Sequence, residues 1–120
     1  MPLQSDVSPA FERWLAELQL WAISSGATTW LIDLEPYVSC RVVGIVERLR
    51  IDPLSGYIEA TVFDGTAAAP ARWAIRRSTE ELAAVPGRGV VLEGMAVIGH
   101  DGELLLDEPS LRTIHFPYGA

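Results

Sequence analysis

The sequence of 120 residues lacks lysine, has only one cysteine and contains no long apolar run. A single cysteine, Cys40, excludes an internal disulfide, and its place in an apolar segment predicts a small buried side chain rather than a reactive thiol. No apolar stretch reaches the roughly 20 residues that cross a bilayer, and the N-terminus lacks a basic-then-apolar signal pattern. We therefore expect a cytoplasmic protein with no membrane segment.

Motifs for catalysis and metal binding are also missing. The two histidines, His100 and His115, do not have the spacing of a metal site. No serine occupies a Gly-x-Ser-x-Gly turn, and no glycine-rich phosphate loop is present. We therefore predict that the protein is not an enzyme and needs neither a metal nor a cofactor.

Positive charge is scarce, because nine arginines face 16 acidic residues and the net charge is −7. Nucleic-acid-binding proteins usually carry a basic footprint, since neutralised phosphates supply much of the affinity. Six of the arginines lie within residues 39–77 beside four acids, and this is the only net-positive segment. The composition thus argues against tight nucleic-acid binding, whereas this segment leaves a weak interaction open.

The sequence does contain short apolar segments separated by turn residues. Proline and glycine in residues 52–56, and Asp-Gly pairs at residues 64–65 and 101–102, are typical of loops and hairpins. A short helix is predicted at residues 79–84, between the third and fourth segments. This order predicts a mainly β protein, a five-stranded OB-fold Greek-key barrel. The predicted strands are residues 39–51, 57–63, 70–76, 89–98 and 103–107.

Two residues refine the predicted strands. Gly44 interrupts the first strand and predicts a bulge or sharp bend, which a small barrel needs where one strand joins both layers. Pro70 restricts the third strand to an edge or a late start, because proline has no amide hydrogen to donate.

Residues 1–38 are assigned to an amphipathic helix and a connector, and residues 39–120 to the barrel with a short tail. Ser8 and Pro9 fit the N-cap and first helical position, and Gly26 fits the C-terminal cap. Apolar residues then recur at helical spacing and form one face. These residues are Phe11, Trp14, Leu15, Leu18 and Ala22.

Two interpretations of this helix stay open. Its apolar face can pack on the barrel and close one end. Alternatively, Trp14, Leu18 and Trp21 form a homodimer or partner interface, since interfaces are rich in aromatic residues. The helix shows no basic face, so binding to a membrane surface is not expected.

Strand alternation also predicts a ligand-binding face. Tyr57 and Phe63 point outward from the second strand, and Arg72 and Arg76 from the third. Rings beside guanidinium groups stack bases and hold phosphates in single-strand binders. Trp73 alternates inward and fits a core position better than a stacking surface. The candidate nucleic-acid-binding residues are Arg48, Arg50, Tyr57, Phe63, Arg72, Trp73, Arg76 and Arg77.

Several motifs carry a family resemblance over roughly residues 32–114. They are VGIV at residues 43–46, FDGT at residues 63–66, Trp73 with Arg76 and Arg77, Pro86-Gly87, LEG at residues 92–94 and Asp101-Gly102. With these motifs the chain resembles short OB-fold proteins of actinobacteria described as nucleic-acid-binding domain proteins. More distantly, it is similar to the barrel of anticodon-binding and helicase wedge domains. The resemblance implies binding to single-stranded nucleic acid.

Two functions follow as hypotheses. The first is weak binding of single-stranded DNA or RNA, mostly without sequence preference. The second is a protein-protein interaction module that uses the N-terminal helix and its tryptophans. Charge discriminates between them, because an acidic surface favours a protein partner and the arginines of the first and third strands favour nucleic acid.

Overall fold

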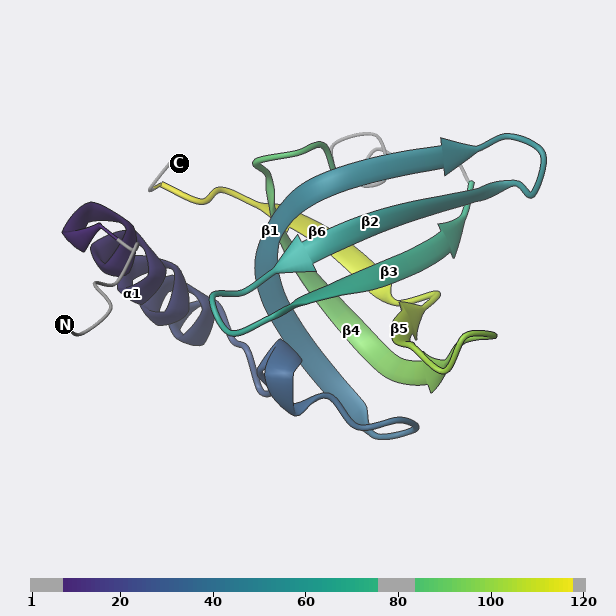
Figure 1. Ribbon diagram of the computed structural model, residues 1–120, viewed down its shortest axis with the longest axis horizontal. Coiled ribbons are helices and arrows are strands. Elements are labelled where there is room, and N and C mark those ends of the chain that lie inside the picture. Colours follow the sequence, from purple (N-terminus) through teal and green to yellow (C-terminus); the bar gives the residue numbers. More distant parts are fainter. Residues whose placement is uncertain (1–7, 76–83, 118–120) are drawn as a thin grey trace, which may run out of the picture.

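The computed structural model describes residues 8–75 and 84–117, and the chain forms one barrel with a helix at one end (Figure 1). The predicted helix at residues 79–84 falls almost wholly outside the described residues, as do Arg76 and Arg77. The elements in chain order are α1 (Pro9–Ser24), the 3-10 helix η1 (Leu31–Asp33), β1 (Ser39–Asp52), β2 (Tyr57–Phe63), β3 (Ala68–Ala74), β4 (Gly89–Ile98), β5 (Leu104–Asp107) and β6 (Ser110–Ile114).

The strands form a closed sheet in the order β1-β2-β3-β5-β4-β6, and pairing of β1 with β4 closes it. Strand β1 serves both layers, since its first half pairs with β4 and its second half with β2. A register shift between Val46 and Arg48 bends β1 sharply, which Figure 1 shows as a long curved arrow. The predicted bulge therefore lies just past Gly44. With the parallel β3–β5 pair, this order is that of the OB-fold, and the predicted fold class is confirmed.

The third strand begins and ends two residues earlier than predicted. Pro70 lies inside β3, opposite Thr61 of β2. Strand β5 pairs with β3 at Ala71 and Arg72, just past the proline. Pro70 is tolerated because, among the described residues, no strand on that side needs an amide hydrogen from position 70.

A sixth strand, β6, lies where the sequence predicted only a tail. It pairs with β4 from Gly89 to Glu93, whereas β5 pairs with β4 from Ala96 to Ile98. Glu108, with φ 50°, and Pro109 separate the two strands. After this break the chain resumes pairing along the same side of β4.

The barrel interior matches the predicted alternation. Ile58, Ala60 and Val62 of β2 are buried, and Trp73 of β3 is 3% exposed in the same core. Trp73 is therefore a core residue, as its inward position predicted. Ile75 would continue the inward alternation of Ala71 and Trp73, but it is exposed, because β3 ends at Ala74 and the alternation stops there.

Helix α1 begins as predicted and packs on its own barrel. The Ser8 side chain accepts a hydrogen bond from the Phe11 amide at 3.1 Å, which caps the helix. Leu18 is fully buried, and the Trp21 indole donates to the His115 carbonyl oxygen at 3.2 Å. Two of the three residues proposed for a partner interface, Leu18 and Trp21, are thus covered within the chain itself.

A second apolar cluster joins α1 to the barrel. Trp14 stacks on Phe63 with ring centroids 6.2 Å apart, and Trp21 meets Phe116 edge-on at 4.9 Å. Val43 and Val91 complete this cluster from β1 and β4. The helix therefore closes one end of the barrel, the first of the two interpretations.

A buried carboxylate fixes the connector that follows α1. Asp64, 1% exposed, accepts hydrogen bonds from the Leu31 amide at 2.7 Å and the Thr66 hydroxyl at 2.6 Å. These bonds join η1 to the turn between β2 and β3. The sequence predicted only a turn at this position, since the partner amide lies 33 residues away.

Candidate ligand-binding face

The outer face of β1, β2 and β3 carries two adjoining hollows. The smaller has a volume of about 170 Å³ and is lined by Arg48, Arg50, Glu59 and Thr61. The larger, which we call the barrel groove, has a volume of about 470 Å³ and shares Glu59 with the smaller one. The barrel groove is lined by Glu59, Pro70, Arg72, Val97, Ile98, Gly99, His100, Asp101, Glu103 and Leu105. Its lining comes from β2 and β3, from the end of β4, from the β4–β5 loop and from β5. This is the region where OB-folds bind their ligands.

Tyr57 and Arg72 meet on this face as the sequence predicted. The guanidinium carbon of Arg72 lies 5.1 Å from the centroid of the Tyr57 ring. They come from adjacent strands, because Glu59 is the register partner of Arg72 and Tyr57 lies two residues before it. The pair forms a flat surface that can stack against a planar group.

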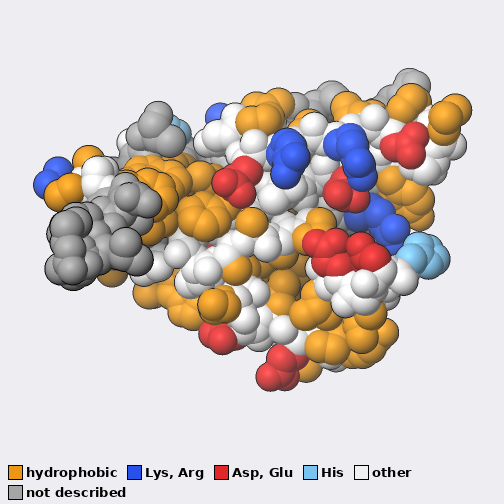
Figure 2. All heavy atoms as spheres, viewed as in Figure 1, with side chains coloured by type: hydrophobic (Ala, Val, Ile, Leu, Met, Phe, Trp, Pro, Cys, Tyr) orange, Lys and Arg blue, Asp and Glu red, His pale blue; other side chains and the backbone are white. Residues whose placement is uncertain are grey.

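Acidic residues pair with two of the arginines on the face. Arg50 lies 3.4 Å from Glu59, and Arg72 lies 3.1 Å from Asp107. Within the described part of the chain, Arg48 makes no ion pair of this kind. Figure 2 shows the consequence: arginine and acidic side chains alternate over these strands instead of forming a continuous basic band.

Other predicted site residues lie elsewhere. Phe63 is half-buried beneath Trp14 of α1, at the end of β2 away from Tyr57. Trp73 lies in the core, so its ring offers no stacking surface. Arg76 and Arg77 fall outside the described residues. The structure therefore brings together Arg48, Arg50, Tyr57 and Arg72.

Three acidic residues on this face carry roles that the sequence analysis did not assign. Asp107 pairs with Arg72, and the Glu108 carboxylate accepts a hydrogen bond from the Ala74 amide at 2.9 Å. Glu59 pairs with Arg50. Of these pairs, only Glu59 with Arg50 shows a signal in the sequence, since both lie in strands joined by a short loop.

The β1–β2 loop is tied by Asp52. Its carboxylate accepts hydrogen bonds from the Leu54 amide at 3.0 Å and the Ser55 amide at 3.3 Å. Bonds from Ser55, with smaller help from Leu54, lower the pKa of Asp52 from its ordinary 3.8. Leu54 is 97% exposed at the tip of this loop.

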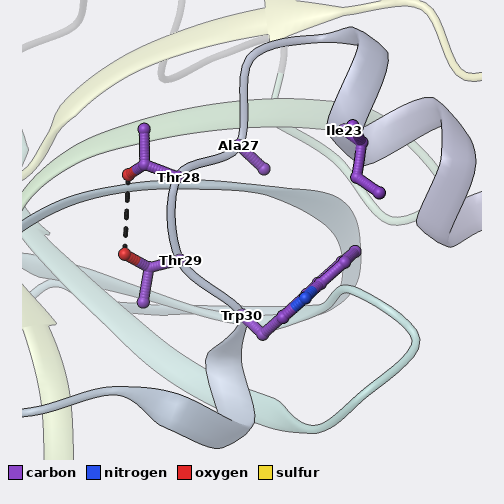
Figure 3. Close-up of a pocket in the computed structure, with 5 residues that line it drawn as sticks. All are labelled: Ile23, Ala27, Thr28, Thr29 and Trp30. Atoms are coloured by element: carbon purple, nitrogen blue, oxygen red, sulfur yellow. Dashed lines mark hydrogen bonds between the residues drawn. The ribbon is translucent and has the colours of Figure 1, made fainter.

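A third hollow lies between the end of α1 and the connector, away from this face (Figure 3). Its volume is about 120 Å³, and Ile23 and Trp30 face each other across it beside Ala27, Thr28 and Thr29. The hydroxyls of Thr28 and Thr29 lie 3.5 Å apart. Its lining is mainly apolar and carries no charge.

Cys40 is half-buried, and burial raises the pKa of its thiol from the ordinary 9.0. The predicted small buried residue is thus partly accessible. In residues 8–75 and 84–117, no group of three or more histidine, cysteine or acidic side chains could hold a metal ion. No helix in the same ranges is long and apolar enough to span a membrane.

The strand order, the shared strand β1 and the face over β2 and β3 define an OB-fold domain. No protein-family model matches the chain, and no curated protein matches it. It is similar in structure to solved OBody structures.

Two of these structures are OBody AM3L09 and OBody AM3L15, each bound to hen egg-white lysozyme. The first has a TM-score of 0.60 and 18% identity, and covers 74% of this chain and 95% of its own. The second has a TM-score of 0.58 and 20% identity, and covers 74% of this chain and 94% of its own. At these identities the likeness establishes the fold.

Proposed function

We propose that the protein is a non-enzymatic OB-fold module that binds a segment of another protein across the barrel groove. One observation carries the proposal: Arg50 and Arg72 each pair with a carboxylate on the face where an OB-fold ligand lies. A phosphate backbone binds through arginines that are available to it, because release of its counterions drives binding. The net charge of −7 repels a polyanion further.

The shape and lining of the barrel groove also support a protein ligand. Its volume of about 470 Å³ accepts several side chains, and Pro70, Val97 and Leu105 supply an apolar floor. Polar and charged side chains surround this floor. An apolar centre with a polar rim is the usual composition of a protein interface.

Photo-crosslinking tests this function. A photoreactive amino acid at Thr61, which lines the adjoining hollow, should give discrete protein adducts in cells that make the protein. The same amino acid at Arg112, an exposed position on β6, serves as the control and should give none of them. Equal adducts at both positions, or none at Thr61, would contradict a protein ligand on this face.

Weak binding of single-stranded DNA or RNA is a second candidate. It is favoured by the Tyr57–Arg72 pair, 5.1 Å apart, and by Arg48, for which the described residues provide no ion-pair partner. Base stacking on such a ring contributes roughly 1–3 kcal/mol per base. Fluorescence anisotropy with labelled oligothymidine and oligouridine at low salt tests it. Binding that disappears in Arg48→Ala with Arg72→Ala would establish this candidate instead.

A further inference from the structure

The rim of the barrel groove is acidic. Glu59 lines it from β2, and Asp101 and Glu103 line it from the β4–β5 loop. Arg72 is the arginine in the lining, and Asp107 already holds its guanidinium group at 3.1 Å. The groove lining therefore holds more acidic side chains than arginines.

Hydrogen bonds fix the backbone of the β4–β5 loop and the carboxylate of Asp101. The Gly99 amide donates to the Glu103 carbonyl oxygen at 2.7 Å, and the Gly102 amide donates to the Gly99 carbonyl oxygen at 3.0 Å. Asp101 accepts the Glu103 amide through one carboxylate oxygen at 3.1 Å. The loop is thus a closed turn, and in the described chain Glu103 forms no ion pair. Because the loop backbone and Asp101 are already ordered, little conformational freedom is lost there when a cation binds.

Apolar side chains line the same groove as these carboxylates. Val97, Ile98 and Leu105 line the groove beside the acidic loop, and Ile98 is 52% exposed. A ligand that covers this floor gains hydrophobic stabilisation in proportion to the area that it buries. The groove therefore suits a segment that offers both apolar and cationic side chains, the former for the apolar lining and the latter for the loop carboxylates.

We propose that the barrel groove binds an extended, basic segment of a partner protein, with arginine or lysine side chains against Asp101 and Glu103. Charge complementarity supports this occupant, because the net charge of −7 attracts a cationic chain as well as repelling a polyanion. The inference rests on the proposed function and specifies the chemistry of the partner.

Fluorescence anisotropy with two short labelled peptides tests it, one of alternating arginine and valine and one with glutamate in place of arginine. The intact protein should bind the arginine peptide at low salt and not the glutamate peptide. Asp101→Asn with Glu103→Gln should weaken binding by about five- to tenfold, as expected for two exposed ion pairs. Asparagine keeps the oxygen that accepts the Glu103 amide, so the loop should stay closed.

Glu12→Gln with Glu35→Gln is the matched control, because it removes the same charge from exposed positions outside the groove. The control should bind within about twofold of the unaltered protein. Equal loss in both double variants would show only general attraction and would overturn the inference, as would preferential binding of the glutamate peptide or of an oligonucleotide.

The outcomes separate the inference from the proposed function. Protein adducts at Thr61 without binding of the arginine peptide would leave the protein-binding function standing and remove the basic partner. Absence of adducts together with oligonucleotide binding would contradict both the protein-binding function and the basic partner.

Discussion

Replacement of Gly44 by alanine tests the close approach on which the barrel depends. A Cβ atom at this position would lie 2.6 Å from the Phe63 carbonyl oxygen and 2.8 Å from Cγ1 of Val62. Both distances are shorter than carbon atoms in proteins tolerate, and the first contact is with backbone. Strand β1 would therefore have to move away from β2 at the point where it leaves β4.

The expected magnitude follows from two opposing terms. Overpacking costs typically about 1–3 kcal/mol, and a backbone contact places Gly44→Ala in the upper half of that range. Alanine also restricts the unfolded chain, which returns about 0.4–1 kcal/mol. The net loss in unfolding free energy is then about 1–2.6 kcal/mol, or roughly 4–10 °C in Tm for a domain of this size. Gly44→Val should lose more, because its two methyl groups enter the same space.

Thermal unfolding followed by circular dichroism measures this effect. Gly94→Ala is the matched control, since its Cβ would lie 3.3 Å from Pro109 Cα and needs only a small adjustment. It should change the unfolding free energy by less than about 1 kcal/mol. If Gly44→Ala has the same Tm as the unaltered protein, or if both variants lose the same unfolding free energy, the close approach to β2 is not the reason why position 44 requires glycine.

Three further predictions concern the helix, the β1–β2 loop and the thiol. Leu18→Ala should lower the unfolding free energy by about 2–5 kcal/mol, because its side chain is fully buried between α1 and the barrel. A denaturant titration with light scattering checks this, and a change in mass without loss of stability would show an interface instead. Because the pKa of Asp52 is lower in the folded protein than its unfolded value of 3.8, its carboxylate stabilises the fold above that value and ceases to do so as the pH falls through the folded value. The Tm difference between Asp52→Ala and the unaltered protein should therefore shrink from pH 7 to pH 3. A constant difference would contradict this prediction. The raised pKa of Cys40 should make alkylation by iodoacetamide at pH 8.5 slower in the folded protein than in urea, and equal rates would argue against burial as the cause.

Local chemistry made most of the barrel predictable from the sequence. Alternation in β2 identified its buried residues, and Asp-Gly pairs marked turns at Gly65 and Gly102, both with positive φ. Ser8 and Pro9 located the start of α1. Each of these signals lies within a few residues of the structure that it specifies.

Strand β6 was missed because its signal is interrupted. Pro109 lies two residues after the end of β5 and immediately before β6, where proline normally interrupts a strand, and the five residues of β6 alternate only weakly. In the structure Glu108 adopts φ 50°, which turns the chain so that Ser110 pairs with Glu93. Strand β6 forms because it pairs with β4, and no local sequence pattern predicts it.

The electrostatics of the candidate face could not be predicted by counting charges along the chain. Residues 39–77 are net positive in the sequence, which favoured a site for phosphate. The closed barrel brings Asp107 of β5, 35 residues away, against Arg72 through a parallel pairing at the seam of the sheet. Segments that are far apart in the sequence therefore neutralise one another on the surface.

This neutralisation bears directly on the choice of ligand. A guanidinium group already bound to a carboxylate has to give up that bond before it contacts a phosphate, so its contribution is reduced by the bond that it loses. A cationic protein segment has no such cost at Asp101 and Glu103, which line the groove with no ion-pair partner among the described residues. The arginines that favoured nucleic acid in the sequence are thus paired with carboxylates in the structure, and this pairing favours the proposed protein ligand over a polyanion.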